Sequence, residues 1–163
     1  MLMTLEVGCG EFGFSAAHSG LHDGQFEPLH GHSFQVTLRL SGTPDAHGML
    51  VDFTKVKTAL REAIAPLRRR TLMPGHAPDV RITREHNTVS VAGGGKCYVL
   101  PGEDVVVLPL ANTTTEALAG YLLDQVLPHL DGVDVTTVEL ELSEAADTAA
   151  TARADLTAGR RAP

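Results

Sequence analysis

A chain of 163 residues is the size of one ordinary domain, and its 43% of hydrophobic residues is enough for a core and too high for a disordered chain. Its 13 basic and 20 acidic residues leave a net charge of -7, which disfavours binding to nucleic acid or to an anionic membrane because both would repel it. No apolar run approaches the roughly 20 residues of a membrane span, and no signal peptide is evident. The two cysteines, Cys9 and Cys97, are too few for the disulfide framework of a small secreted domain, so we expect a cytoplasmic protein.

The first part of the chain predicts two strands and a helix. Residues 10–18 form a candidate strand, and residues 19–29 carry the Gly, Asp and Pro of a loop. Residues 33–40 alternate polar with apolar side chains, which is typical of a half-buried strand. Asp52 is a candidate cap for a helix over residues 55–70. The apolar residues of that helix recur at helical spacing: Val56, Leu60, Ile64 and Leu67.

Residues 75–108 differ in character from the segments on either side. Short apolar segments alternate there with Gly-rich turns, a pattern that indicates strands at residues 80–83, 88–91, 96–100 and 104–108. We expect an inserted β-hairpin region within the domain, because so short a segment cannot bury a core of its own.

The last part of the chain predicts a second helix and a strand. Thr113 and Glu116 have the spacing of a capping box at the start of the helix, and residues 136–142 alternate as a strand does. We therefore expect one α+β domain over residues 1–153, with helices on one face of an antiparallel sheet, and a disordered tail at residues 154–163.

Three histidines form a candidate metal site. His30 and His32 are two residues apart at the start of a predicted strand, so their side chains point to the same face. His18 ends the preceding candidate strand, and antiparallel pairing would bring it alongside them. Three neutral imidazoles leave a fourth tetrahedral position open, which is typical of catalytic zinc. The alternative is that they bind no metal, because a His-x-His sequence is common.

The sequence resembles a known family. Residues 14–18, 29–34, 48–53 and 112–116, together with Glu144, closely match in type and order the motifs of the 6-pyruvoyl-tetrahydropterin synthase and 6-carboxy-tetrahydropterin synthase (QueD-like) family. The resemblance implies a tunnelling fold (T-fold), an antiparallel four-stranded sheet with two helices on one face. It also implies a homo-oligomer, usually a hexamer of two trimers, with active sites between subunits.

The same resemblance implies the roles of individual residues. The zinc ligands of the family fall on His18, His30 and His32, and its pterin-anchoring glutamate falls on Glu144. A carboxylate suits that role because it accepts two parallel hydrogen bonds from a 2-aminopyrimidinone edge. Threonines that help to hold the pterin in the family match Thr114 and Thr115.

Members of the family act on 7,8-dihydroneopterin triphosphate, which loses triphosphate and has its side chain rearranged or cleaved. Zn2+ orients the side-chain hydroxyls of the substrate and acts as a Lewis acid.

Two substitutions depart from the family pattern. Phe26 stands where most members carry a cysteine that acts as general base, and a phenyl ring cannot transfer a proton. The adjacent Glu27 lies in a Glu-x-x-His-Gly-His motif that resembles the glutamate branch of the family (class III), in which the product shifts towards 6-hydroxymethyl-7,8-dihydropterin. We therefore expect Glu27 to be the catalytic base; the alternative is a solvated loop charge.

The second departure removes an Asp-His pair. Arg68 and Arg69 stand at its two positions, and arginine is always protonated at neutral pH, so neither can act as a base. Either Arg69 binds an anionic group of the substrate, or the ordinary pterin chemistry is changed or lost. His22 and His76 are candidate substitutes for the missing histidine.

Three hypotheses follow. The first is a zinc-dependent lyase of the glutamate branch that acts on a pterin-like substrate. The second keeps zinc lyase or cyclase chemistry but changes the substrate, as in a specialised metabolic pathway. The third is an oligomeric pterin-binding protein without catalysis.

Overall fold

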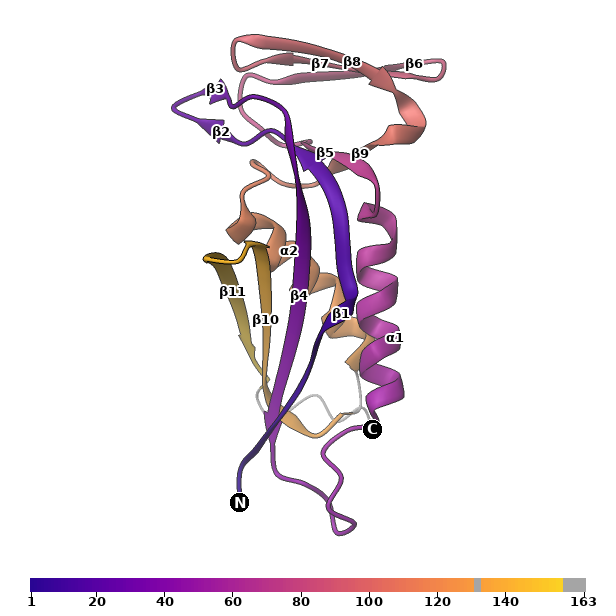
Figure 1. Ribbon diagram of the computed structural model, residues 1–163, viewed down its shortest axis with the longest axis vertical. Coiled ribbons are helices and arrows are strands. Elements are labelled where there is room, and N and C mark those ends of the chain that lie inside the picture. The colour runs from indigo at the N-terminus through magenta and orange to yellow at the C-terminus, as the bar shows by residue number, and fades with distance from the viewer. Residues whose placement is uncertain (131–132, 157–163) are drawn as a thin grey trace.

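A long, twisted six-stranded sheet forms the main part of the fold (Figure 1). The computed structural model describes residues 1–130 and 133–156, with only the backbone of Cys9. Four strands run antiparallel in the order β11-β10-β4-β1, and two short strands, β5 and β9, extend the sheet in parallel with β1. Their bounds are β1 Met3–His18, β4 His30–Gly42, β5 Arg70–Pro74, β9 Val105–Leu108, β10 Val135–Ala145 and β11 Thr148–Asp155.

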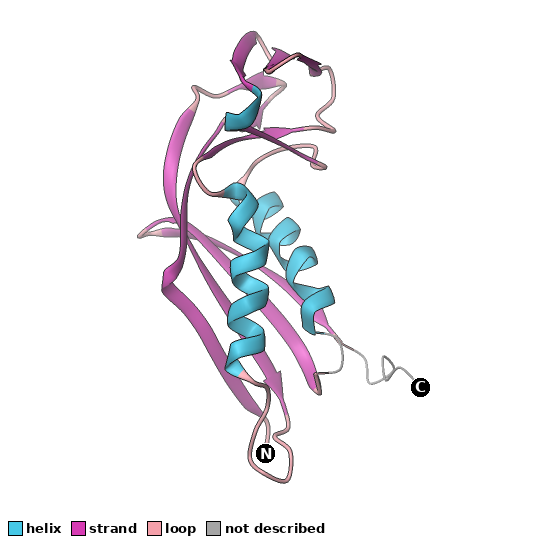
Figure 2. Ribbon diagram, turned by 90° about the vertical axis from the view of Figure 1, so that its right-hand side faces the viewer, coloured by secondary structure: helices cyan, strands magenta, loops and turns pink. Residues whose placement is uncertain are grey.

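Two helices cover one face of this sheet (Figure 2). α1 spans Phe53–Ile64 and α2 spans Thr115–Val126, and each continues into a short 3-10 turn, Ala65–Leu67 or Leu127–Leu130. The core lies between helices and sheet, where the fully buried side chains include Phe34, Leu38, Leu60, Leu122 and Leu140. The α+β fold with helices on one face is thus confirmed, and the sheet has two strands more than expected. No helix among the described residues is long and apolar enough to cross a membrane.

The first helix ends earlier than its apolar spacing indicated. Asp52 caps it as expected, accepting a hydrogen bond from the amide of Thr54 (2.8 Å), but the helical backbone stops at Leu67. Arg69 has a left-handed backbone (φ 56°), and its amide donates to the carbonyl of Ser15 (2.7 Å). Residues 68–69 therefore form a turn that leads the chain into β5, a strand that helical spacing could not predict.

β11 is the second element that the sequence pattern missed. It consists mainly of alanine and threonine, so it lacks the apolar alternation by which β10 was predicted. The strand continues to Asp155, two residues into the segment expected to be disordered, and residues 157–163 of that segment lie outside the described residues.

The predicted insertion forms a separate small sheet. β6 (Arg81–Glu85), β7 (Thr88–Gly93) and β8 (Lys96–Pro101) pair antiparallel, and a 3-10 turn (Gly102–Asp104) leads into β9, which joins the main sheet instead. The small sheet lies over one end of the main sheet, beside a short hairpin of β2 (Leu21–His22) and β3 (Gln25–Phe26) (Figure 1). A second apolar cluster fills the contact: Phe26, Met73, Val89, Val91 and Val105.

Candidate metal centre and active site

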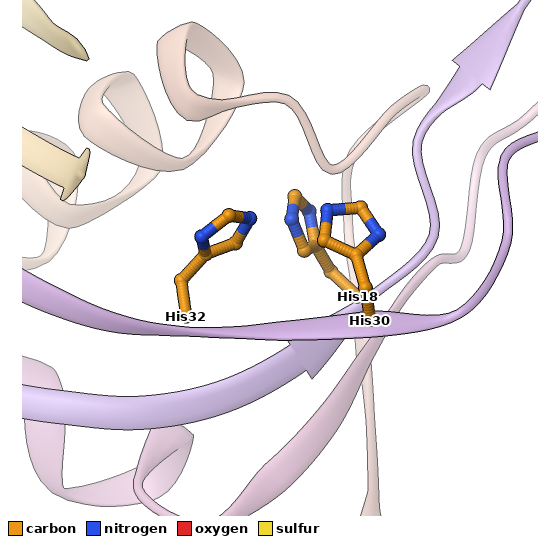
Figure 3. Close-up of side chains that lie close together, drawn as sticks. All are labelled: His18, His30 and His32. Carbon is orange, nitrogen blue, oxygen red and sulfur yellow. The ribbon is translucent and has the colours of Figure 1, made fainter. Parts of the chain in front are cut away.

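The three histidines meet at the end of the main sheet. The register of β1 and β4 places His18 directly opposite His30 and Ala16 opposite His32. Neighbours across a strand pair and residues two apart share a face, so all three imidazoles lie on the helix-covered side. Their rings point toward a common space (Figure 3), and one ligand atom of each lies within 4.8 Å of the others.

Backbone carbonyls orient two of these rings. Nδ1 of His18 donates to the carbonyl of Thr113 (2.7 Å), and Nδ1 of His30 donates to the carbonyl of Pro28 (2.8 Å). A ring that donates through Nδ1 keeps the lone pair of Nε2 free for a metal, and such outer hydrogen bonds are usual for metal-ligating histidines.

Nε2 of His18 is buried and has no hydrogen-bond partner among the described residues. A buried polar atom without a partner is costly, and a metal ion at this position would satisfy it. The three histidines are also the one group of metal-binding side chains found in the described part of the chain. Three imidazole nitrogens are a ligand set that fits Zn2+.

The pKa of His18 is lowered from its ordinary value of 6.5, chiefly because burial disfavours the charged ring. His30 and His32 lower it further, whereas the hydrogen bond to Thr113 and the carboxylate of Glu144 oppose the shift. His18 is therefore neutral at neutral pH, the form that binds a metal.

Glu144 is held beside this centre. The pairing of β10 with β11 shifts register between Ser143 and Ala145, so Glu144 lies at a β-bulge, a device that redirects a side chain. The hydroxyl of Thr115 donates to Oε2 of Glu144. Thr114 caps α2 by accepting from the amide of Ala117 (3.3 Å), so the capping-box assignment to Thr113 was wrong. Thr113 is instead fully buried.

Glu27 lies at the same end of the sheet. Its amide donates to the carbonyl of Gly20 (2.9 Å), two residues after His18. Its carboxylate lies over Gly20, with Oε2 3.3 Å from the position that a Cβ of Gly20 would occupy. The residue is exposed, so a substrate can reach it.

Phe26 has a packing role. It is 4% exposed, and its ring packs against Met73, Val89 and Val91, and edge-on against Tyr98 with 5.9 Å between ring centroids. The ring of Phe26 thus packs the small sheet against the main sheet.

Arg68 and Arg69 do not belong to the face of the sheet that the three imidazoles share. The guanidinium of Arg68 donates to the carbonyl of Glu11 (2.8 Å). Arg69 and Arg70 line an open depression of about 610 Å3, whose lining also includes Ser33 and His32. Ser33 alternates with the metal-facing positions of β4, so this part of the lining belongs to the opposite face of the sheet.

The remaining histidines lie outside the cluster. His22 and His76 are exposed, and neither belongs to the metal-binding group found among the described residues. They therefore gain no support as substitutes for the missing histidine. Cys97 is exposed and free, whereas the side chain of Cys9 lies outside what is described.

Comparison with known proteins places the chain in a family. The family model of 6-pyruvoyl tetrahydropterin synthase matches residues 9–155. The chain belongs to the 6-pyruvoyl tetrahydropterin synthase family. A proposed 6-carboxy-5,6,7,8-tetrahydropterin synthase of Methanocaldococcus jannaschii is 27% identical over 135 residues, which are 80% of this chain and 83% of that protein. Another of the same name, from Pyrococcus abyssi, is 28% identical over 116 residues, 71% of this chain and 68% of that protein.

Solved structures of this family share the fold. A Plasmodium vivax 6-pyruvoyltetrahydropterin synthase, solved as a catalytic-residue mutant with glutamate changed to alanine, has a TM-score of 0.88 and 26% identity and covers 96% of this chain and 99% of that chain. The Plasmodium falciparum 6-pyruvoyl tetrahydropterin synthase has a TM-score of 0.89 at 22% identity, with 95% and 99% coverage. The T-fold expected from the resemblance is confirmed.

The sequence named the histidines and the carboxylates that the structure places at this end of the sheet, but it did not indicate the groups that contact them. The carbonyls of Thr113 and Pro28 carry no side-chain signal, and the contacts of Lys96 and Tyr98 with Glu27 depend on the packing of β8 against a distant segment. No local pattern could have revealed these partners.

Proposed function

We propose that the protein is a zinc-dependent lyase that acts on a pterin of the dihydroneopterin triphosphate type. The observation that carries the proposal is the histidine centre: two of its rings are oriented by backbone carbonyls, and a buried Nε2 of His18 faces the other two. A carboxylate for the pterin ring and a second carboxylate for proton transfer lie at the same end of the sheet.

Each residue has a separate task in this proposal. Zn2+ held by His18, His30 and His32 would supply Lewis-acid polarisation of a side-chain oxygen of the substrate. Glu144 accepts two hydrogen bonds from the 2-aminopyrimidinone edge and so fixes the ring. Oε2 of Glu144 accepts from Thr115, so Oε1 and the remaining lone pairs are available to the pterin.

Glu27 is the proposed base that removes the proton from the substrate side chain. It is exposed, and its carboxylate lies over Gly20, close to the end of β1 that carries His18. The catalytic residue named for the similar Plasmodium vivax structure is also a glutamate. Thr114, the cap of α2, lies next to Thr115 and is proposed to line the pterin site.

Arg69 is proposed to bind an anionic group of the substrate. The ion pairs found among the described residues do not include its guanidinium, and arginine forms paired hydrogen bonds with phosphate oxygens. Arg69 lines a depression on the face of the sheet opposite to the one that the three imidazoles share, so this role fits a site that a second subunit completes.

We also propose a homo-oligomer, a hexamer of two trimers. In the described part of the chain β11 has one neighbour, β10, and β5 pairs with β1 only from Ala16 to His18, which leaves the first part of β1 open on that side. Open strand edges pair with strands of other copies, and cyclic symmetry closes such an arrangement. Light scattering coupled to size-exclusion chromatography tests this: a monomeric mass would contradict it.

The function is tested by incubating the zinc-loaded protein with 7,8-dihydroneopterin triphosphate. We expect triphosphate release together with a pterin product identified by mass spectrometry, and loss of both in Glu27→Gln. Glu103→Gln removes an exposed carboxylate from the 3-10 turn before β9 and is the matched control, with activity retained. Tight pterin binding without turnover would favour a binding protein, and the absence of binding would favour a different substrate.

A further inference from the structure

The carbonyl oxygen of Glu27 is the meeting point of three side chains. The hydroxyl of Ser19 donates to it at 2.7 Å, the ammonium of Lys96 at 2.6 Å and the hydroxyl of Tyr98 at 3.4 Å. Ser19 follows the metal-facing His18, whereas Lys96 and Tyr98 belong to β8 of the inserted sheet. The insertion therefore contacts the backbone of the proposed base directly.

The hairpin of β2 and β3, which precedes Glu27, lies beside the same small sheet (Figure 1). The amide of Phe26 donates to the carbonyl of Gly94 (2.8 Å), in the turn between β7 and β8. Gly94 has φ +53°, and a Cβ there would lie 2.7 Å from the ring of Phe26. The turn thus fits closely around Phe26 because it has no side chain.

The other side of this hairpin is fastened to the main domain. The side-chain amide of Asn112 donates to the carbonyl of Leu21 and accepts from its amide, both at 2.8 Å. The hairpin is thus held between the start of α2 and the inserted sheet, and Glu27 leaves it at the inserted sheet.

The carboxylate of Glu27 has no hydrogen-bond or ion-pair partner among the residues that the structure describes. Its position therefore depends on the backbone that carries it. The bonded carbonyl belongs to the peptide that joins Glu27 to Pro28, and the next carbonyl, that of Pro28, orients His30. Fixing this peptide sets the relation between the base and a metal ligand, and catalytic groups need placement within about 0.5 Å.

We propose that Lys96 is a positioning residue for Glu27 and that the inserted sheet β6–β8 serves to hold the proposed base in place. Lys96 has the shorter contact and a charged donor, so it is the dominant partner from β8, and Tyr98 supports it through Ser19 (3.3 Å between hydroxyl oxygens). A carbonyl oxygen has two lone pairs, which Ser19 and Lys96 use. The inference rests on the proposed function for the role of Glu27, but the ordering of residues 20–29 by Lys96 stands apart from it.

The test compares Lys96→Met, Lys96→Arg and the wild type, with Arg84→Met as the matched loss of a cation from β6 of the same sheet. Hydrogen exchange of the peptide spanning residues 20–29 is measured together with kcat, KM and zinc content on 7,8-dihydroneopterin triphosphate. In Lys96→Met we expect faster exchange in this peptide and a kcat lower by about 10- to 100-fold, with KM and zinc content retained. Lys96→Arg, which keeps a charged donor, recovers most of kcat, and Arg84→Met behaves as the wild type.

Two results overturn the inference. Unchanged exchange at residues 20–29 in Lys96→Met means that Lys96 does not order the segment. Faster exchange with an unchanged kcat means that the ordering does not serve catalysis. A wild type that releases no triphosphate contradicts the proposed function instead, and the exchange comparison still decides whether Lys96 holds the segment.

Discussion

The ring of His18 hydrogen-bonds the carbonyl of Thr113, a residue 95 positions further along the chain, at 2.7 Å. The next two residues cap α2 through Thr114 and bond Glu144 through Thr115. One short segment before and at the start of α2 therefore orients a candidate metal ligand and the candidate pterin anchor together. Changes in this segment should separate effects on the metal from effects on the ring.

Thr115→Val tests the hold on Glu144. Removal of the hydroxyl leaves the carboxylate without its donor, so we expect pterin binding to weaken by about 1 to 2 kcal/mol, roughly 5- to 30-fold in Kd. Thr115→Ser keeps the hydroxyl and should bind as the wild type does. Pterin fluorescence titration measures the Kd, and metal analysis should find the same zinc content in all three proteins. An unchanged Kd in Thr115→Val would contradict the role assigned to this contact.

His30→Ala tests the metal centre. The variant loses one of three nitrogen ligands, so we expect zinc content to fall well below that of the wild type. Bound metal stabilises the folded state, by about 4 kcal/mol when its concentration is 1,000 times Kd, so chelation should lower the Tm of the wild type but not that of His30→Ala. His86→Ala, which removes an exposed histidine from the turn after β6, is the control. Equal zinc content in His30→Ala and the wild type would refute the site.

The histidine face was predictable because its signals are local. Alternation along a strand decides that His30 and His32 share a face, and antiparallel pairing with the preceding strand brings His18 beside them. Asp52 at the start of α1 was equally readable, because a cap acts within its own turn.

The rest depends on contacts between distant segments. The apolar residues of α1 keep helical spacing as far as Leu67, so they did not predict the turn at Arg69. This turn leads the chain into β5, which pairs parallel with β1. Phe26 and Glu27 are neighbours in sequence, yet Phe26 is buried in an apolar cluster and Glu27 is exposed. Phe26 is buried because the small sheet β6–β8 packs against it. Sequence patterns do not encode such docking.

Phe26→Cys introduces the residue that the family resemblance leads us to expect at this position, and we expect it to introduce no catalytic activity. Its side chain faces the apolar cluster with Met73 and Val91, so the variant loses packing and the thiol is buried. We expect a loss of about 2 to 4 kcal/mol in the free energy of unfolding, measured with urea, and a smaller loss in Phe26→Leu. The double variant Phe26→Cys, Glu27→Gln should remain inactive; recovered turnover would show that the position reaches the substrate.

Two substitutions of Arg69 separate the effect of its backbone conformation from the effect of its charge. They can do so because the left-handed φ of 56° suits glycine better than any other residue. Arg69→Ala and Arg69→Gly both remove the guanidinium, but only the glycine relieves the backbone strain, so Arg69→Gly should be more stable than Arg69→Ala by about 1 kcal/mol. If Arg69 binds an anionic group, both variants raise KM for 7,8-dihydroneopterin triphosphate to the same extent and leave pterin binding without phosphate unchanged. Chemical denaturation and steady-state kinetics on the two variants measure these effects. If KM rises in the less stable Arg69→Ala but not in Arg69→Gly, Arg69 contributes to the turn and does not bind the anionic group.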